Sequence, residues 1–123
     1  IINISSDAGV FGSATMSHYG AAKAGVINLT RSLAIEWATY GIRVNCISPG
    51  PIDTPGVKEV LWPTQELQDK AAGSTALNRF GTGSEVAWPC VFLASKASGY
   101  VNGCNLQVDG CTTRAGIPES ALN

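Results

Sequence analysis

Two residues four positions apart, Tyr19 and Lys23, carry the clearest chemical signal in the chain, and two serines, Ser5 and Ser6, precede them. On a helix, residues at this spacing project from one face about 6 Å apart along the axis. An ammonium held beside a phenol favours the phenolate, so the phenol can exchange a proton with the oxygen of an alcohol or a ketone. A surface tyrosine beside a solvated lysine would show the same spacing. The surrounding segments must therefore distinguish a catalytic pair from a surface pair.

The segments on either side of the pair predict an α/β arrangement. Residues 1–5 are apolar and β-branched, which is typical of a strand in a covered parallel sheet, and residues 42–48 return to strand character. No proline occurs in residues 17–40, which predicts a long helix with Ser17 as its N-cap and Gly41 at its end. A strand, a helix and a strand in this order form a right-handed βαβ unit. The apolar residues expected on the buried face of the helix are Ala22, Val26, Leu29, Leu33 and Trp37.

Shorter elements are predicted elsewhere in the chain. Residues 6–13 have the composition of a loop, and two short helices are predicted around 57–61 and 64–72. A further helix should begin at an N-cap on Ser84 and run through Leu93, with Pro89 in its second turn, where proline can kink a helix. The last predicted strand is 105–108. Three strands cannot cover themselves, so we interpret residues 1–123 as the carboxy-terminal part of one domain whose amino-terminal half is missing.

The composition restricts the class of protein. The chain has 123 residues, of which 45% are hydrophobic, and its net charge is -1. It contains no block of basic residues, so nucleic acid is not an expected partner, and no apolar run reaches the ~20 residues of a membrane span. Its first residues lack the features of a signal peptide. These features are typical of a cytoplasmic protein.

The cysteines predict neither a metal site nor a disulfide framework. Cys46, Cys90, Cys104 and Cys111 show no Cys-x-x-Cys spacing, and they do not cluster with His18, the single histidine. We therefore interpret them as four reduced thiols.

Four motifs in the chain resemble the second half of a classical short-chain dehydrogenase/reductase. They are Ile-Ile-Asn-Ile-Ser-Ser (1–6), Tyr-Gly-Ala-Ala-Lys-Ala-Gly (19–25), Ile-Arg-Val-Asn-Cys-Ile-Ser-Pro-Gly-Pro-Ile-Asp-Thr (42–54) and Gly-Cys-Asn-Leu-Gln-Val-Asp-Gly (103–110). Each motif alone is weakly specific, but all four occur in the family's order over nearly the whole chain. The resemblance implies the carboxy-terminal portion of a Rossmann-like doubly wound parallel sheet.

The resemblance also implies roles for three residues. The family's catalytic serine lies thirteen positions before its tyrosine, which selects Ser6 rather than Ser5. Ser6 would then hydrogen-bond the substrate oxygen, and Tyr19 would transfer the proton that accompanies hydride transfer. Lys23 would promote ionisation of the phenol and bind the ribose of the nicotinamide cofactor.

A second set of residues is similar to the family's loop over the nicotinamide ring of NAD or NADP. Pro49, Gly50, Ile52 and Thr54 match this loop, with the Ile52 backbone and the Thr54 hydroxyl expected near the carboxamide or a phosphate. An ordinary proline-rich turn is the alternative. In the family, the glycine-rich phosphate loop, the residue that selects NAD or NADP, and a fourth catalytic residue, an asparagine, would all precede Ile1.

Two further segments bear on the substrate and on the backbone. Residues 55–82 correspond to the family's substrate lid, and we use the word lid for them below. An apolar lid with a few cations suits a hydrophobic or acyl-thioester substrate, although the same side chains could simply pack the lid onto the sheet. The chain departs from the family's terminal Asp-Gly-Gly turn, because Cys111 replaces the last glycine, which could adopt backbone angles that a cysteine resists. The lid's apolar residues are Val57, Val60, Leu61, Trp62, Leu67, Leu77 and Phe80, and its cations are Lys58, Lys70 and Arg79.

The resemblance therefore implies an NAD(P)-dependent oxidoreductase that interconverts a small-molecule ketone and a secondary alcohol, with 3-oxoacyl thioester reduction among the candidates. The full-length protein is expected to be a homodimer or homotetramer, and the fragment alone to be inactive. One alternative is a non-catalytic dinucleotide sensor or scaffold on the same fold, although such relatives commonly lack the tyrosine or the lysine. Another is a finished interaction module, which would unfold cooperatively as a monomer.

Overall fold

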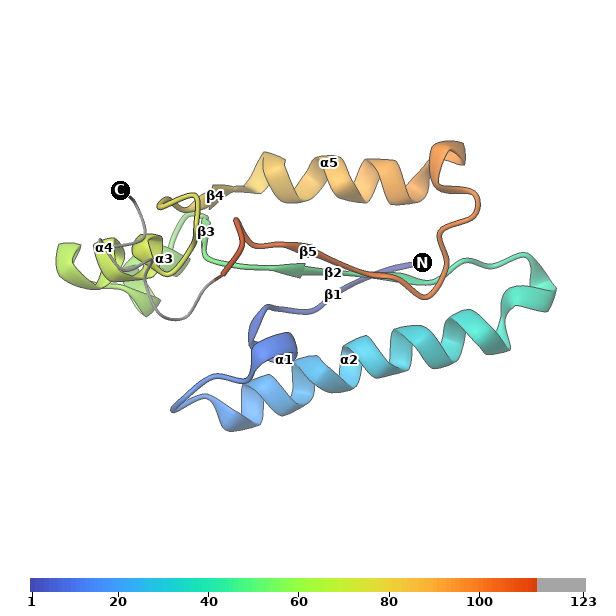
Figure 1. Ribbon diagram of the computed structural model, residues 1–123, viewed down its shortest axis with the longest axis horizontal. Helices are drawn as coiled ribbons and strands as arrows, with labels where there is room; N and C mark the ends of the chain where they lie inside the picture. Colours follow the sequence, from blue (N-terminus) through green and yellow to red (C-terminus); the bar gives the residue numbers. More distant parts are fainter. Residues whose placement is uncertain (113–123) are drawn as a thin grey trace, which may run out of the picture.

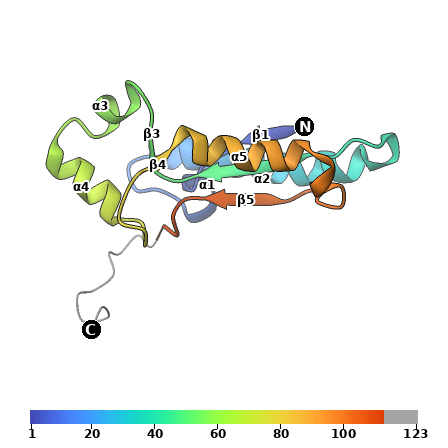
Figure 2. The same cartoon turned by 90° about the horizontal axis from the view of Figure 1, so that it is seen from above.

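A computed structural model describes residues 1–112 of the chain (Figure 1). Its centre is a three-stranded parallel sheet with the spatial order β1-β2-β5, and one long helix covers each face (Figures 1 and 2). The predicted α/β fold with a parallel sheet is confirmed. The elements in chain order are β1 (Ile2–Ile4), α1 (Ala8–Phe11), α2 (Ser17–Glu36), η1 (Ala38–Tyr40), β2 (Asn45–Pro49), β3 (Ile52–Asp53), α3 (Val57–Leu61), α4 (Gln65–Gly73), β4 (Gly81–Thr82), α5 (Gly83–Ala94), η2 (Lys96–Ser98) and β5 (Asn105–Val108).

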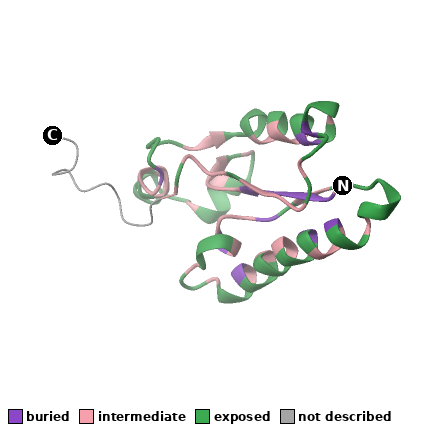
Figure 3. Ribbon diagram, turned by 45° about the vertical axis from the view of Figure 1, so that its right-hand side comes forward, coloured by how far each residue is buried: buried purple, intermediate pink, exposed green. Residues whose placement is uncertain are grey.

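The core lies around the central strand β2, which is buried on both faces (Figure 3). α2 lies on one face of the sheet and α5 on the other, so β2 alternates its side chains between two helices. Burial of these apolar side chains is the main favourable contribution to the sheet's stability. The buried hydrophobic residues are Ala8, Ala34, Val44, Cys46, Ile47 and Leu93.

The strands form close to the predicted segments, with one displacement. β5 has the predicted bounds, whereas β2 begins at Asn45 rather than at residue 42. The residues before it bond to other segments, because the Arg43 guanidinium donates to the carbonyl oxygens of Leu93 (2.9 Å) and Val101 (3.0 Å). These contacts hold the chain between η1 and β2 without extending the ladder.

Helix α2 is shorter than the predicted helix, because it ends at Glu36 rather than at residue 40, and its N-cap differs as well. The Gly20 N–H donates to the Met16 carbonyl at 2.9 Å, so Met16 is the N-cap and Ser17 is already helical. The predicted N-cap at Ser17 is therefore wrong by one position. Near its end α2 gives way to the 3-10 turn η1, and Gly41, with a φ of 71°, ends the turn in the left-handed conformation that glycine adopts without strain.

The predicted buried face of α2 is only partly correct, because Val26, Leu33 and Trp37 are half-buried and the fully buried positions are small residues. Its buried positions are Gly20, Thr30 and Ala34, whereas Leu29 is 52% exposed. Small side chains bring the helix backbone close to the strands. The Thr30 hydroxyl also accepts a hydrogen bond from the Asn3 side chain at 2.9 Å, which joins the helix to β1.

Two features were not predicted from the sequence. Residues 8–11, within a segment predicted to be a loop, form the short helix α1. The strands β3 and β4 pair in parallel, Ile52 with Gly81 and Asp53 with Thr82, and this two-stranded sheet closes the base of the lid. Figure 2 shows the lid helices α3 and α4 beyond the ends of the three-stranded sheet. Their bounds lie within one residue of the predicted short helices.

Helix α5 begins with a capping box rather than at the predicted Ser84. The Thr82 hydroxyl accepts from the Glu85 N–H at 3.3 Å, and the Glu85 carboxylate accepts from the Thr82 N–H at 2.9 Å. These reciprocal bonds satisfy two amide groups that the first helical turn leaves without partners. The helix continues through Pro89 to Ala94.

The capping carboxylate gives a prediction for stability against pH. Hydrogen bonds from Arg79 and from the Thr82 backbone lower the pKa of Glu85 from 4.5 to about 2. A carboxyl group with a lowered folded-state pKa stabilises the fold fully above its unfolded pKa, and this contribution is lost as the pH falls toward the folded value. We expect the urea midpoint of the wild type to exceed that of Glu85→Gln at neutral pH, with the difference shrinking between about pH 4.5 and pH 2. Arg79→Met should reduce the same pH dependence, and a constant difference at all pH values would contradict the prediction.

Cys111 occupies a conformation that favours glycine. Its φ is 60°, in the left-handed region, and that of the preceding Gly110 is 63°. The Cys111 N–H donates to the Asp109 carboxylate at 3.0 Å, and its carbonyl accepts from the Ala76 N–H at 2.9 Å. The turn thus forms with a cysteine at a position that favours glycine, and it is held by bonds on both sides. None of the helices in the described part of the chain has the length and hydropathy that a membrane span requires.

Candidate active site

The predicted site residues come from three segments that meet at the carboxyl edge of the sheet. β1 leads into Ser5 and Ser6, and β2 leads into the loop of residues 49–54. Helix α2 runs back against the strands, so its first two turns, with Tyr19 and Lys23, lie at the same edge (Figure 1). Parallel α/β sheets bind ligands at this edge.

The tyrosine and the lysine lie on one side of α2. The Lys23 Nζ is 5.7 Å from the centroid of the Tyr19 ring, and both residues are half-buried. The helical spacing thus produces the predicted juxtaposition. An ammonium over the face of a phenol is attracted by the negative potential of the ring, which holds the two side chains together.

Two hydrogen bonds join the second turn of α2 to the end of β1. The Lys23 Nζ donates to the Ile4 carbonyl at 3.1 Å, and the Ser5 hydroxyl donates to the Lys23 carbonyl at 2.7 Å. An ammonium has three N–H donors, so this arrangement leaves further donors of Lys23 for a ligand. These two bonds therefore fix the position of Lys23 before any ligand binds.

The two serines have different environments. Ser5 is 4% exposed and its hydroxyl is bonded to the helix backbone, whereas Ser6 is half-buried. The Ser6 Oγ accepts from the Ala8 N–H at 3.2 Å and donates to the Asp7 carboxylate at 3.0 Å. These contacts are local, and rotation about the C–O bond can turn the hydroxyl proton from Asp7 to the oxygen of a ligand. Ser6 is thus the better placed of the two serines to meet a substrate.

Helix α1 packs against α2 at backbone distance. A Cβ added to Gly9 would lie 2.7 Å from the Ala24 nitrogen, and one added to Gly20 would lie 3.0 Å from the Ala8 carbonyl oxygen. Gly9 is therefore required for the two helices to touch here, and Gly20 allows the close approach of the Ala8 carbonyl. The contact fixes the segment after Ser6 against the helix that carries Tyr19.

The predicted cofactor loop is attached to the neighbouring strands on both sides. The Pro49 carbonyl accepts from the Asp7 N–H at 2.9 Å, and the Gly50 N–H donates to the Val108 carbonyl at 3.1 Å. A Cβ on Gly50 would lie 2.8 Å from the Asp109 Cα, so only glycine allows this approach. The loop thus lies directly beside the segment that carries Ser6.

The remaining loop residues lie at the base of the lid. Ile52 belongs to β3, and the Thr54 carbonyl accepts from the Val57 N–H at 3.2 Å, where α3 begins. A cavity of about 420 Å³ opens between the lid and the end of β5, and its walls include Ile52, Leu77 and Val108. Ser6, Tyr19 and Lys23 do not line it. Of the predicted site residues, Ile52 therefore lies in the wall of this cavity, apart from the catalytic candidates.

Two of the lid's cations are engaged in ion pairs. Lys58 lies 3.2 Å from the Asp53 carboxylate, and Arg79 lies 2.6 Å from the Glu85 carboxylate. Lys58 also lies 5.0 Å from the centroid of the Phe80 ring. These pairs stabilise the base of the lid.

Most of the lid's apolar side chains are exposed. Val60 is 77% exposed and Leu77 is 61% exposed, whereas Trp62 and Phe80 contact each other edge to face at 5.1 Å. Packing of the lid onto the sheet thus accounts for few of its apolar residues.

The described residues also bear on metal and thiol chemistry. Within residues 1–112, no three His, Cys, Asp or Glu side chains are grouped as metal ligands would be. All four cysteines are free, and burial raises the pKa of the Cys46 thiol, which lies in the core.

Comparison with known proteins adds independent information. The family model described as Enoyl-(Acyl carrier protein) reductase matches residues 1–113. The chain is 45% identical over 94 residues to a probable 2,4-dienoyl-CoA reductase of Bacillus subtilis. These aligned residues cover 76% of this chain and 37% of the relative. It is 43% identical over 110 residues to the 3-oxoacyl-[acyl-carrier-protein] reductase FabG of Chlamydia muridarum, covering 89% of this chain and 43% of the relative.

Solved structures with the same fold include two dehydrogenases. One is 4-hydroxyisoleucine dehydrogenase complexed with NADH, with a TM-score of 0.86 and 30% identity over 94% of this chain and 47% of that chain. The other is a putative gluconate dehydrogenase from Agrobacterium tumefaciens, with a TM-score of 0.84 and 39% identity over 89% of this chain and 43% of that chain. The chain thus spans less than half the length of each of these four proteins.

Proposed function

The chain belongs to the classical short-chain dehydrogenase/reductase family, and we propose that it forms the carboxy-terminal part of an NAD(P)-dependent oxidoreductase that interconverts a ketone and a secondary alcohol. The chain's share of each relative's length leaves room for an amino-terminal half that would supply the phosphate-binding loop. The exposed edge of β1, where Ile4 is 46% exposed, offers a surface for that half.

One observation carries the proposal. The Lys23 ammonium lies over the Tyr19 ring and is fixed to the end of β1, at the edge where the Ser6 hydroxyl is accessible. In reduction, Tyr19 would donate its proton to the carbonyl oxygen while Ser6 holds that oxygen by a hydrogen bond. In oxidation the proton would move in the opposite direction. A positioned acid of this kind contributes roughly 10²–10⁴ to the rate.

The cofactor we propose is NAD or NADP, which when bound supplies or accepts the hydride. A neighbouring structure in complex with NADH supports a nicotinamide dinucleotide. The residues proposed to contact it are Tyr19 and Lys23 at the ribose and Pro49, Gly50, Ile52 and Thr54 at the nicotinamide. Lys23 fits this role because it keeps N–H donors beyond the one bonded to Ile4.

A 3-oxoacyl thioester is the substrate class we propose to test first. The two curated relatives reported above are named as a dienoyl-CoA reductase and a 3-oxoacyl-[acyl-carrier-protein] reductase, and the exposed apolar side chains of the lid suit an acyl chain. We also propose a cytoplasmic homodimer or homotetramer. Leu29 and Ile35 on α2, and Trp88 and Val91 on α5, are more than half exposed in the single chain, and a second subunit could cover them.

The proposal is tested with the complete protein and purified cofactors. Acetoacetyl-CoA with NADH or NADPH, and simple secondary alcohols with the oxidised cofactors, should give turnover that is followed by the absorbance of the reduced nicotinamide. Ser6→Ala should lower that turnover strongly. Dinucleotide binding without turnover of any ketone or alcohol in the panel would instead support the non-catalytic sensor.

A further inference from the structure

Asp7, the residue after the candidate catalytic serine, connects three segments of the site. Its carboxylate accepts from the Ser6 hydroxyl at 3.0 Å through Oδ1 and from the Thr112 hydroxyl at 3.4 Å through Oδ2. Its backbone N–H donates to the Pro49 carbonyl at 2.9 Å. One residue thus contacts the serine, the cofactor loop and the turn that follows β5.

The turn that carries Thr112 is fixed by its own hydrogen bonds. The Asp109 carboxylate accepts from the N–H groups of Cys111 (3.0 Å) and Thr112 (3.3 Å). The Thr112 hydroxyl has a second acceptor, the Asp109 carbonyl at 3.4 Å. A charged acceptor binds a hydroxyl more strongly than a neutral one, so the Asp7 carboxylate is the stronger of the two partners.

The same turn is bonded to the end of the lid. Thr112 forms an antiparallel bridge with Thr75, which is 4% exposed. The N–H groups of Ala76 and Leu77 donate to the carbonyls of Cys111 (2.9 Å) and Gly110 (3.2 Å). A continuous set of hydrogen bonds therefore runs from the lid through Thr112 and Asp7 to the Ser6 hydroxyl.

We propose that Asp7 is a positioning residue that holds the Ser6 Oγ in place for the substrate oxygen, and that Thr112 links this position to the lid. The inference rests on the proposed function. Ser6 Oγ is held from two sides, by the Ala8 N–H and by the Asp7 carboxylate. In the free protein the carboxylate thus selects one rotamer of Ser6, and when the proton rotates about the C–O bond from Asp7 to a bound ketone, the Ala8 N–H bond keeps Oγ in place. Without the carboxylate, Oγ could adopt other staggered rotamers, and misplacement of a catalytic group slows the reaction.

The test uses single variants of the complete protein with acetoacetyl-CoA and reduced cofactor. Thr112→Val removes one hydroxyl at nearly constant volume and should lower kcat roughly fivefold, whereas Asp7→Ala should lower it roughly tenfold or more. The KM for the cofactor should change by less than about twofold, because neither side chain is proposed to bind it. Thr39→Val, in η1 at the opposite edge of the sheet, is the matched control and should leave kcat unchanged.

Rescue by a conservative variant separates positioning from stability. In Asp7→Asn the amide oxygen can still accept from Ser6 and the amide N–H can donate to the Thr112 hydroxyl, so kcat should return to within about threefold of the wild type. The urea midpoints of the variants should not follow their kcat values. A common fall of midpoint and kcat, with no rescue by asparagine, would show a merely structural role and overturn the proposal.

The Ser6→Ala background tests whether Thr112 acts through Ser6. Thr112→Val should have no further effect on the residual kcat there, and a full additional fivefold loss would overturn the inference. If the Ser6→Ala rate is too slow to measure, the single variants and the asparagine rescue decide. If Ser6→Ala abolishes turnover while Asp7→Ala and Thr112→Val leave kcat unchanged, this inference alone fails. If the wild type turns over no substrate, the proposed function fails with it.

Discussion

Replacement of Tyr19 by phenylalanine is expected to lower kcat of the complete protein by roughly 10²–10⁴-fold while nucleotide binding remains. The change removes one hydroxyl and keeps the aromatic ring that lies 5.7 Å from the Lys23 ammonium. The bonds that join Lys23 to Ile4 and Ser5 do not involve the phenol oxygen, so α2 should stay in place. The loss would then report proton transfer rather than folding. Steady-state kinetics and fluorescence titration with NADH or NADPH measure the two quantities separately.

A matched control is available in the same chain. Tyr40 is 76% exposed in η1, at the end of α2 that lies far from the catalytic candidates (Figure 1). Tyr40→Phe makes the same chemical change there and should leave kcat near the wild-type value. If Tyr19→Phe also retained more than about a tenth of the wild-type kcat, the role given to Tyr19 would be wrong.

Lys23→Met should combine a loss of turnover with a loss of cofactor affinity. Methionine keeps an unbranched side chain of similar length but has neither the charge nor an N–H donor, so it loses the contact with the Tyr19 ring and cannot bind the ribose hydroxyls. We expect kcat/KM to fall roughly 10²–10³-fold, as for removal of other transition-state donors. The dinucleotide Kd should rise as well, which distinguishes this variant from Tyr19→Phe. Loss of the bond to the Ile4 carbonyl should also lower the free energy of unfolding by about 1 kcal/mol.

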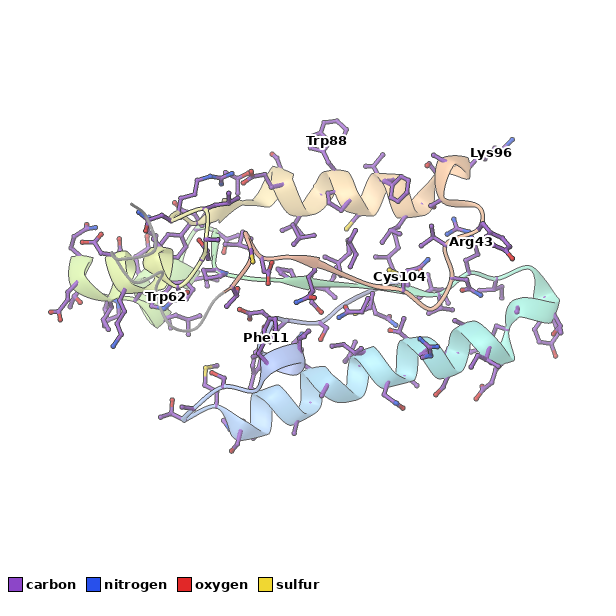
Figure 4. All side chains as sticks on the ribbon, viewed as in Figure 1. Phe11, Arg43, Trp62, Trp88, Lys96 and Cys104 are labelled. Carbon is purple, nitrogen blue, oxygen red and sulfur yellow. The ribbon has the colours of Figure 1, made fainter. Side chains whose placement is uncertain are left out.

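The control for the lysine lies at the other edge of the sheet. Lys96, at the start of η2, is exposed and points away from the sheet in Figure 4. Lys96→Met should change neither kcat nor the dinucleotide Kd. An unchanged Kd in Lys23→Met as well would contradict the proposed contact with the ribose.

The sequence predicts the elements of this fold better than the way they pack. The Asp-Gly pair at 109–110 marks the end of β5, and the proline-free segment 17–40 predicts one helix where the structure has α2 followed by η1. The buried face of α2 could not be predicted from apolar periodicity, because small residues such as Gly20, Thr30 and Ala34 make that face. Two larger apolar residues of the helix, Leu29 and Ile35, are exposed in the single chain.

The N-caps predicted for α2 and α5 are wrong because residue type alone does not select an N-cap. Ser84 and Thr82 are both suitable N-caps by residue type, and the chain uses Thr82 because Glu85 lies three residues after it. That capping-box spacing is present in the sequence and could have corrected the prediction. At α2 the N-cap is Met16, which no side-chain preference would select.

For the candidate site, too, the sequence predicts the local arrangement, whereas the long-range contacts are known only from the structure. The four-residue spacing of Tyr19 and Lys23 accounts for their shared helix face, and resemblance to the family selects Ser6. The structure adds that Ser5 is buried and bonded to the α2 backbone. The contact between Asp7 and Thr112 joins residues 105 positions apart, and no local pattern indicates it.

The two hydrogen bonds between the end of β1 and the second turn of α2 determine when the Lys23 side chain loses its configurational entropy. Ser5 and Lys23 each bond to the other segment, so the ammonium is ordered by the same event that forms the sheet. The configurational freedom of a long lysine side chain is therefore given up when the chain folds, and little of it remains to be given up when a ligand arrives. Such an arrangement favours fast capture of a dinucleotide and a small entropic penalty of association.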